Sequence, residues 1–352
     1  MKAVIAIDSF KGSLTSAEAA SAVAEGLAGY DCVIMPVSDG GEGFSRILTE
    51  AIGGQMITVL AHDPLGREIE ASYGIAGTKA VIESAAASGL TLMSPDELDP
   101  LRASSRGTGE MIADAIRRGA RDIYVGFGGT GTNDGGAGML RAMEEVRGLW
   151  PQCRFTGLCD VSAVFCGPQG ATAVYGPQKG VKPGQTEELD GRLRELAGQY
   201  RPVLGRDVLT KPGSGAAGGM AGALWAVAGG ELKPGADAVL DILGFEDRLA
   251  GATLVVTGEG RIDAQTLQGK LPAVVARRAR AFSPTLRVAA FAGQVRLAGA
   301  GTPSEGRRTL FDDIIQITPE GTPLSLALDP AFAGARLTEA VSSLVSQWQP
   351  TI

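Results

Sequence analysis

Histidine is almost absent from this sequence, which contains only His62 in 352 residues. The chain has no G-x-S-x-G motif and no protein-kinase His-Arg-Asp loop. Its Gly269-Lys270 pair is followed by Leu271 instead of the Ser or Thr of a P-loop. His62 itself lies in the turn sequence His-Asp-Pro-Leu-Gly, which favours a loop residue over a catalyst. A Ser-His-Asp triad is therefore not expected, and acid–base chemistry must come from carboxylates or lysines.

Cysteine is scarce as well, and acidic residues outnumber basic ones, 39 to 32. The four cysteines form no C-x-x-C pair, so a structural zinc site is not expected and nothing demands a disulfide. A formal net charge of -7 argues against nucleic acid or an anionic membrane as the main partner. The charge-free stretch at residues 212–230 is rich in Gly and Ala, which predicts a buried, closely packed helix and no membrane span. No signal peptide is visible, so we expect a cytoplasmic protein.

Glycine, by contrast, is abundant, with 51 residues where a usual share of about 7% would give half as many. Three apolar runs end in glycine-rich turns that carry carboxylates, at residues 33–43, 123–136 and 254–263. A buried parallel strand reads as a continuous apolar run, and ligands of open α/β sheets bind just past the carboxyl ends of strands. These segments predict amide donors and acidic groups where a phosphorylated ligand and its metal would bind.

Strand and helix patterns alternate at both ends of the chain, whereas short alternating strands follow residue 55. Thr15 and Glu18 form a capping box at the first helix. Residues 56–60, 68–75 and 79–83 predict an antiparallel meander. We therefore predict an α/β fold with two domains. The first is a discontinuous domain of residues 1–55 and 250–352, a parallel doubly wound sheet (flavodoxin- or Rossmann-like) with helices on both faces, and the second is an inserted mixed α/β domain of residues 56–249.

Several charged residues lie where strands are predicted to end. Asp8 closes the first strand and could bind a substrate hydroxyl or a metal, and Lys11 could hold a phosphate. Asp39 lies among glycines before a predicted helix. Arg106, beside a helix start, and Lys179, in a Pro/Gly turn, could each bind a carboxylate or a phosphate. The simpler interpretation of Asp8 and Lys11 is a capped strand-to-helix turn, and that of Asp39 is a hairpin loop. Arg106 and Lys179 would then be solvated surface charges.

Residues 126–131 match G-x-G-x-x-G, follow a predicted strand and precede a predicted helix, which is the context of a dinucleotide-binding fingerprint. The next apolar run ends at Asp160, where an acid for a ribose would be expected. In so glycine-rich a chain, this match indicates a nucleotide or phosphate more firmly than it indicates NAD. Residues 257–263 again place acids in a predicted glycine turn after a strand.

Taken in order, these motifs resemble those of the glycerate kinase family of bacterial type, the branch that makes 2-phosphoglycerate. The resemblance covers residues 8 to about 275, and Gly131 is a minor departure where the family commonly has Ala or Ser. The matching segments are residues 8–14, 36–43, 83–90, 106–110, 128–138, 176–180, 215–219 and 257–263.

The resemblance implies an ATP- and Mg²⁺-dependent kinase that acts on D-glycerate, with its active site in the cleft between two α/β domains. For that reaction we expect Arg106 to bind the substrate carboxylate, Asp8 or Asp39 to act as the base, and Lys11 or Lys179 to bind the phosphates of ATP. The expected ATP-binding residues are Gly128, Gly129, Thr130, Thr132, Asn133, Gly135, Lys179, Gly258 and Gly260. The expected Mg²⁺ ligands are Asp160, Glu259 and Asp263, with Asp134 behind them.

Two other functions stay open at this point. The match at residues 126–131 together with Asp160 also fits a Rossmann-type NAD(P)-dependent oxidoreductase of a small hydroxy acid, although such an enzyme usually needs a His or Lys acid beside its substrate. A non-catalytic nucleotide sensor is the third hypothesis. Small molecules are the expected partners in each case, and the oligomeric state is open, with a homodimer as one option.

Overall fold

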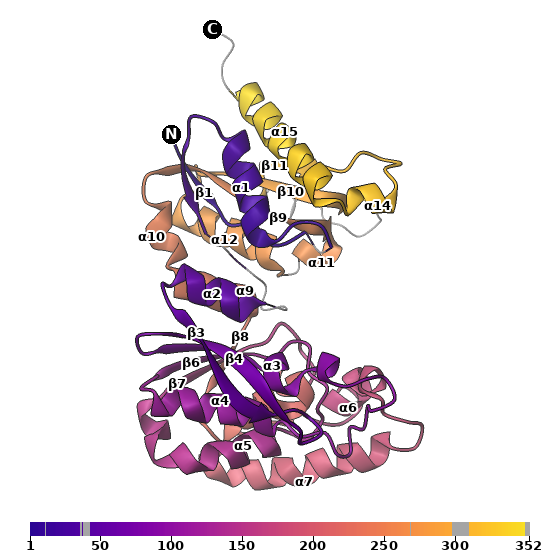
Figure 1. Cartoon of the computed structure of the whole chain (residues 1–352). Coiled ribbons are helices and arrows are strands. Elements are labelled where there is room, and N and C mark those ends of the chain that lie inside the picture. Colours follow the sequence, from indigo (N-terminus) through magenta and orange to yellow (C-terminus); the bar gives the residue numbers. More distant parts are fainter. Residues whose placement is uncertain (11, 36, 38–42, 268, 298–309, 349–352) are drawn as a thin grey trace. The chain divides into compact units, whose positions relative to one another are not determined.

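The computed structural model describes residues 1–10, 12–35, 37, 43–267, 269–297 and 310–348. The chain divides into two compact units, which we call unit 1 (Met1–Asp39 and Ala236–Ile352) and unit 2 (Gly40–Gly235). Figure 1 shows the elements of each unit. The division assigns helix α2 (Phe44–Ala51) to unit 2 and helix α10 (Phe245–Leu249) to unit 1. The boundaries predicted at residues 55 and 250 would assign both helices the other way.

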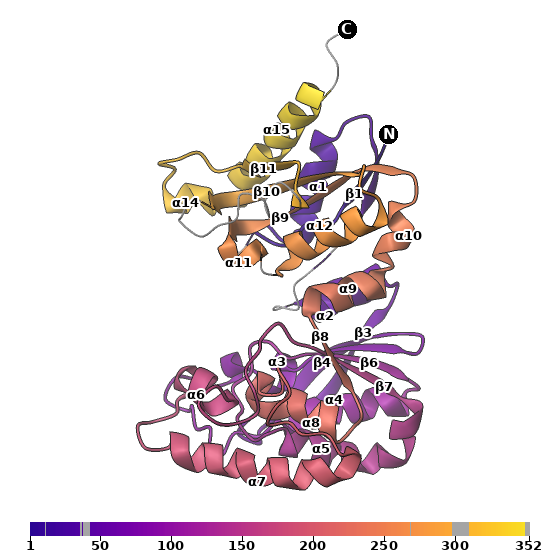
Figure 2. The same cartoon turned by 180° about the vertical axis from the view of Figure 1, so that it is seen from behind.

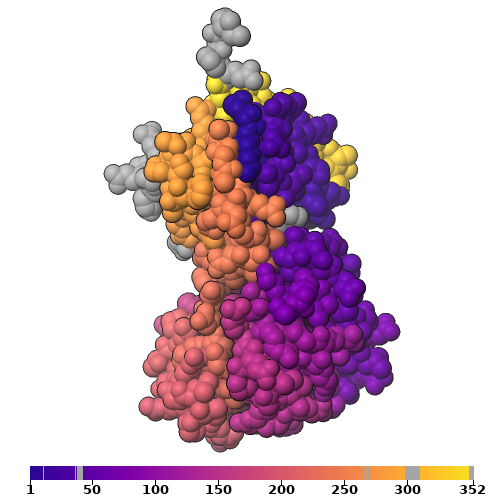
Figure 3. Space-filling view, turned by 90° about the vertical axis from the view of Figure 1, so that its left-hand side faces the viewer, coloured from indigo at the N-terminus to yellow at the C-terminus, as the bar shows by residue number. Residues whose placement is uncertain are grey.

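Unit 1 is built on a fully parallel five-stranded sheet with the order β11-β10-β9-β1-β2. Segments from the two ends of the sequence are neighbours in it, because β1 pairs with β9, and Figure 3 shows the indigo and orange segments side by side. The predicted parallel doubly wound sheet is confirmed. Its strands are β1 (Lys2–Ile5), β2 (Asp31–Ile34), β9 (Ala252–Asp263), β10 (Arg287–Arg296) and β11 (Asp313–Gln316).

Helices cover both faces of this sheet, as Figures 1 and 2 show from opposite sides. Helix α1 (Ser16–Gly26) begins with the predicted capping box, in which Thr15 and Glu18 each accept a hydrogen bond from the other's backbone N–H. It packs closely on α15 (Pro330–Trp348), since a Cβ at Gly26 would lie 2.7 Å from the Thr338 carbonyl oxygen. The other helices in the described part of unit 1 are α9 (Gly235–Leu243), α10, α11 (Ala264–Leu267), α12 (Leu271–Phe282), which lies on the other face, and α14 (Leu324–Ala327).

The glycine-rich segment at residues 257–263 is not a turn, and this prediction is wrong. These residues are the second half of β9, which pairs with β10 as far as Asp263 and Arg296. Gly258 is needed here for a close approach, because a Cβ would collide with the Phe291 carbonyl of β10. The acidic residues of the segment are therefore held by a rigid sheet.

Unit 2 is built on a mixed six-stranded sheet with the order β3-β4-β5-β6-β7-β8. The first three strands are antiparallel, which confirms the predicted meander, and the rest are parallel. His62 is the last residue of β3 and not the loop residue that was predicted. The strands are β3 (Gln55–His62), β4 (Glu68–Ala76), β5 (Lys79–Glu83), β6 (Asp122–Gly126), β7 (Arg154–Leu158) and β8 (Glu231–Lys233).

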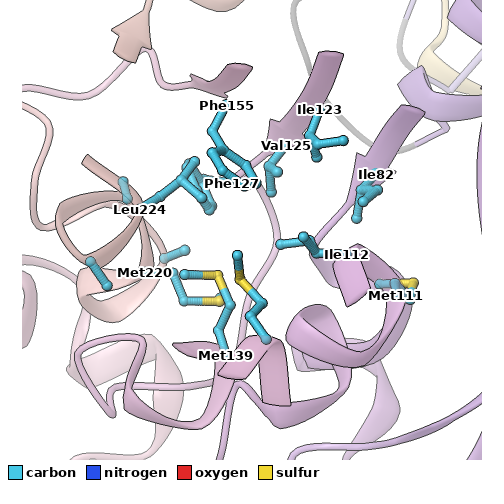
Figure 4. Packing of buried hydrophobic residues seen from close by; sticks show 14 of the residues in the cluster. Ile82, Met111, Ile112, Ile123, Val125, Phe127, Met139, Phe155, Met220 and Leu224 are labelled. Carbon is cyan, nitrogen blue, oxygen red and sulfur yellow. The ribbon is translucent and has the colours of Figure 1, made fainter. Parts of the chain in front are cut away.

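The main core of unit 2 lies between this sheet and the helices α4 (Arg106–Arg117), α5 (Ala137–Met143) and α8 (Met220–Ala226). Figure 4 shows Met111, Ile112 and Met139 of α4 and α5 packed among strand residues. Helix α2 contacts β4 and β5. The remaining helical segments are α3 (Ala85–Ser88), η1 (Leu90–Leu92), η2 (Glu144–Gln152), α6 (Ala171–Tyr175), η3 (Pro177–Lys179), α7 (Thr186–Leu204) and η4 (Ala216–Gly219).

The charge-free stretch at residues 212–230 folds into η4 and α8, whose residues are almost all buried against the core of unit 2. The expectation of a buried, closely packed helix is confirmed, with a kink at Ala217 and Gly218 that divides it. Across the part of the chain that the structure describes, no helix combines the length and the hydropathy of a membrane span.

Candidate functional site

Unit 1 contains a cavity of about 430 Å³, which lies at or near the carboxyl ends of β1, β9, β10 and β11. This is the edge at which open α/β sheets bind ligands. Asp8, Glu259, Arg261 and Lys270 supply its charged groups, and Gly260 lies beside them. The residues that give it an apolar wall are Phe10, Ile317, Leu324, Ala327, Leu328 and Ala333.

The carboxylates of this cavity are held in fixed positions. Asp8 is only 7% exposed, and its Oδ1 accepts a hydrogen bond from the Ser9 backbone N–H at 2.7 Å. Glu259 Oε1 accepts a hydrogen bond from the Thr266 hydroxyl at 2.6 Å, and its Oε2 lies 3.8 Å from Lys270 Nζ. The cavity therefore presents two oriented carboxylates, the ammonium of Lys270 and the guanidinium of Arg261. Together they suit a charged ligand that carries a metal ion.

The other predicted residues of unit 1 have different surroundings. The Gly258 carbonyl accepts a hydrogen bond from the Asp8 backbone N–H at 3.0 Å, so it positions Asp8. Asp263 lies at the end of β9, where its Oδ2 is 3.3 Å from Arg261 Nε. Lys11 and Asp39, two of the predicted catalytic residues, lie outside the described residues.

In unit 2 the predicted nucleotide-binding segment is a loop of ten residues, 127–136, which connects the end of β6 at Gly126 to the start of α5 at Ala137. A dinucleotide fingerprint instead joins its strand and helix by a tight turn. Gly128 and Gly129 are exposed. The Gly131 and Gly135 backbone N–H groups donate to the carbonyls of Ser88 and Gly218, both at 2.9 Å. These two N–H groups are occupied within the fold and do not form a phosphate cradle.

Asp134 joins the N-termini of two helices. Its Oδ2 accepts hydrogen bonds from the Ser105 backbone N–H and hydroxyl, both at 2.9 Å, and from the Gly138 backbone N–H at 3.1 Å. Its Oδ1 accepts one from the Gly136 backbone N–H, also at 3.1 Å. Ser105 and Gly136 are the N-caps of α4 and α5, so this carboxylate satisfies helix ends and is poorly placed to bind a metal.

Thr132, Asn133 and Lys179 form a buried polar cluster. Lys179 is 2% exposed and its Nζ donates a hydrogen bond to the Thr132 carbonyl at 2.7 Å. Burial lowers the pKa of Lys179 to about 8, although the negative charge of Asp134 acts in the opposite direction. Asn133 Nδ2 donates to the Thr172 hydroxyl at 2.9 Å. Among the described residues, the buried Thr132 Oγ1 and Asn133 Oδ1 have no hydrogen-bond partner.

Arg106, predicted to bind a substrate carboxylate, is the first residue of α4 and is more than half exposed. Its Nε donates to Glu110 Oε1 at 2.7 Å. Glu110 also accepts hydrogen bonds from the His62 backbone N–H at 2.8 Å and lies 3.0 Å from His62 Nδ1. Arg106 therefore has a protein carboxylate as its partner, and both residues line a surface cavity of about 720 Å³.

Asp160, a predicted metal ligand, follows β7 and is exposed, and its Oδ1 accepts a hydrogen bond from the Gly235 backbone N–H at 2.7 Å. It belongs to unit 2, whereas Glu259 and Asp263 belong to unit 1. Within the residues that the structure describes, no group of three or more His, Cys, Asp or Glu side chains is arranged to hold a metal ion. One or two carboxylates suffice for Mg²⁺ when phosphate oxygens and water complete its shell.

Three residues of these sites were not among the predicted ones. Lys270 lies beside Glu259 in the cavity, the buried Thr266 donates a hydrogen bond to Glu259, and Thr172 bonds to Asn133. For Lys270, its position directly after a glycine was a sequence signal of a binding residue. Thr266 and Thr172 gave no signal, because their roles depend on contacts that form only in the folded chain.

A parallel α/β sheet whose carboxyl edge opens into a cavity lined by carboxylates and a lysine is typical of enzymes that act on small charged molecules. Comparison with known proteins identifies the family. The model of the glycerate kinase family matches residues 3–149 and 143–349. The chain belongs to the glycerate kinase family, and it is a kinase that phosphorylates glycerate.

The relatives span nearly the whole chain. A glycerate kinase of Bacillus subtilis is 38% identical over 94% of each chain, and a glycerate 2-kinase of Escherichia coli is 40% identical over 95% of this chain and 94% of its own. The crystal structure of a Salmonella typhimurium LT2 protein assigned as glycerate kinase 2 superimposes with a TM-score of 0.85. It has 36% sequence identity and covers 99% of this chain and 98% of its own. The resemblance seen in the motifs is confirmed, and nothing supports the oxidoreductase hypothesis.

Proposed function

We propose that this kinase transfers the γ-phosphoryl group of ATP to the C2 hydroxyl of D-glycerate in a Mg²⁺-dependent reaction, giving 2-phosphoglycerate and ADP. The cavity of unit 1 carries the proposal, because it gathers Asp8, Glu259 and Lys270 at the ligand-binding edge of the sheet. Position 2 is supported by the Escherichia coli relative that is named a glycerate 2-kinase.

Phosphoryl transfer needs positioning and charge neutralisation more than covalent chemistry. Lys270 would contact phosphate oxygens as a point charge beside Gly260. Glu259 would hold Mg²⁺, with its carboxylate oriented by the hydrogen bond from Thr266. The bound ion would neutralise charge on the transferred phosphoryl group. Asp263 and Asp160 remain further candidate ligands, but each already has a charged or backbone partner.

The attacking hydroxyl requires a nearby carboxylate that accepts its proton. We assign this role to Asp8, whose carboxylate is buried, fixed by the Ser9 N–H and part of the cavity. Asp39 is the alternative base. Loss of a general base costs about 10² to 10⁴-fold in rate.

The test compares ADP release from ATP, Mg²⁺ and D-glycerate in the wild type, Glu259→Gln and Lys270→Met. Each variant should lose about 10²-fold or more in kcat/KM, and Glu259→Gln should require more Mg²⁺. Glu25→Gln is the matched control, because Glu25 is an exposed residue of α1 outside the cavity, and it should behave as the wild type. Near-wild-type turnover in both cavity variants would show that the site is misplaced.

A further inference from the structure

Exposed leucines are concentrated on the short helix α14 of unit 1. Leu324 is 72% exposed, Leu326 43% and Leu328 39%. The backbone of this helix is held by its own hydrogen bonds, since the Leu328 N–H donates to the Leu324 carbonyl at 3.0 Å. A group of exposed apolar side chains often marks a surface that a ligand or partner covers. Leu324 and Leu328 line the cavity at the carboxyl edge of the sheet, whereas Leu326 is not among the described residues that line it.

The strand order of unit 1 divides this cavity into two parts of different chemistry. Asp8 follows β1, and Glu259 and Arg261 belong to β9, so the charged groups come from the middle of the sheet. Figures 1 and 2 place α14 at the same end of the sheet as α11, which follows β9. From β10 onward, the described residues that line the cavity are all neutral: Gly293, Gln294, Ile317, Thr318, Leu324, Ala327, Leu328 and Ala333.

The neutral part is held against β10 and is mainly apolar. The Ile317 N–H donates to the Ala292 carbonyl of β10 at 2.8 Å, which ties the segment after β11 to the sheet. The buried Phe10 reaches the same strand, because a Cβ at Gly293 would lie 3.8 Å from Phe10 Cδ1. Phe10, Ile317 and the apolar residues of α14 and α15 therefore form one apolar wall beside the charged groups.

This division selects among the ligands of a kinase. D-Glycerate carries an oxygen on each of its three carbons, so it has no part that an apolar wall would bind. A metal ion gains nothing from such a wall either. A nucleoside triphosphate combines a charged chain with a flat base whose two faces are apolar, and small-molecule sites bind such parts with hydrophobic side chains.

We infer that the apolar wall of unit 1 is the pocket for the base of a nucleoside triphosphate, whose phosphates extend toward Lys270 and Glu259. This assignment rests on the proposed function, because the base belongs to the ATP whose phosphates Lys270 is proposed to contact. It places the base in unit 1 and not at the glycine-rich loop of unit 2, where the Gly131 and Gly135 N–H groups are occupied within the fold.

The apolar side chains of the wall neither donate nor accept hydrogen bonds. They hold the faces of the base by burial, and this contribution grows with the apolar area that is covered. Tripolyphosphate has the charged chain of ATP without the base. It should therefore bind the charged part of the cavity and gain nothing from the wall.

The sharpest test is Leu324→Ser, with Leu326→Ser as the matched control. Both are exposed leucines of α14, and only Leu324 lines the cavity. In calorimetry, Leu324→Ser should raise the Kd of a non-hydrolysable ATP analogue with Mg²⁺ about 5- to 20-fold, the loss of apolar contact with the base. The Kd of tripolyphosphate with Mg²⁺ should stay within about 2-fold. Leu326→Ser should change neither Kd, and both variants should keep the Tm of the wild type.

Three results would overturn the assignment. The first is an unchanged Kd of the ATP analogue in Leu324→Ser. The second is an equal loss of affinity for the analogue and for tripolyphosphate, or an equal loss in Leu324→Ser and Leu326→Ser, since neither depends on contact with the base. The third is a change of oligomeric state in sedimentation with an unchanged Kd, which would assign the leucines to a contact between two copies of the chain.

The outcomes separate this assignment from the proposed function. If the wild type phosphorylates D-glycerate at C2 but the Kd of the analogue is independent of Leu324, the base pocket is refuted and the proposed function stands. If Leu324→Ser weakens the analogue and spares tripolyphosphate, but no phosphoryl group reaches D-glycerate, the base pocket stands and the proposed function fails.

Discussion

Asp134 offers a quantitative test of how unit 2 is held together around the predicted loop. Its carboxylate accepts four hydrogen bonds at the N-termini of α4 and α5, two of them from Ser105. Removal of a side chain that caps a helix costs about 0.5 to 2 kcal/mol per helix. Since two helices lose their acceptor at once, Asp134→Ala should lower the free energy of unfolding by about 1 to 4 kcal/mol. Asp134→Asn keeps one acceptor oxygen, which can retain the three hydrogen bonds made by Oδ2, and loses the bond from the Gly136 N–H together with the charge–dipole attraction of about 0.3 to 1 kcal/mol per helix, so it should cost less than Asp134→Ala.

The assay is urea unfolding followed by the fluorescence of Trp150 and Trp225, the two tryptophans of unit 2. Asp207→Ala is the control, because the half-buried Asp207 carboxylate accepts one backbone hydrogen bond, from the Leu209 N–H at 3.0 Å. The free energy of unfolding should fall much less in Asp207→Ala than in Asp134→Ala. The reasoning is refuted if Asp134→Ala and Asp207→Ala cost the same, or if Asp134→Asn costs as much as Asp134→Ala.

Two further predictions concern the same region. Gly218→Ala should destabilise unit 2 by about 2 kcal/mol or more in urea, because φ is 65° and its Cβ would collide with the Thr132 carbonyl, whereas Gly148→Ala, in open space, should be tolerated. The pKa of Lys179 is about 8 in the folded chain and 10.5 in the unfolded one, so the unfolded chain binds more protons between these values. The stability of the wild type relative to Lys179→Met should therefore be constant below pH 8 and rise by about 3 kcal/mol as pH increases to 10.5. Urea midpoints of both proteins at pH 7, 9 and 10 test this, and a difference that does not change with pH would contradict it.

Elements with local signals could be predicted from the sequence. Thr15 and Glu18 are three residues apart and announce a helix start by themselves, and the alternating segments from residue 55 onward indicate an antiparallel meander before any long-range contact is known. The apolar runs of β1 and β9 indicated buried parallel strands. In each case the pattern that forms the element lies within the element.

The extension of β9 could not be predicted, because glycine-rich sequence is compatible with a turn and with a closely paired strand. What decides between them is the pairing of Gly258 with Phe291 on β10, whose carbonyl lies against Gly258. The two residues are more than thirty positions apart in the sequence. A short strand followed by a loop was the local interpretation, and strand pairing overrode it.

The candidate site was predicted in part for the same reason. Asp8 and Glu259 were expected at strand ends and do line one cavity. The partners of the charged side chains were not visible, since Asp134 bonds to Ser105, 29 residues away, and Lys179 is buried against a carbonyl 47 residues away. Arg106 is an exception, because its partner Glu110 is four residues along the same helix and that spacing already favours an ion pair.

Phosphorus NMR of the product tests the central claim most directly. D-Glycerate, ATP and Mg²⁺ are incubated with the enzyme, and the new phosphomonoester resonance is recorded with proton coupling. Phosphate on C2 has one proton on the adjacent carbon and should give a doublet, as the account predicts. A triplet, from the two protons of C3, or no new phosphorus resonance at all would contradict it.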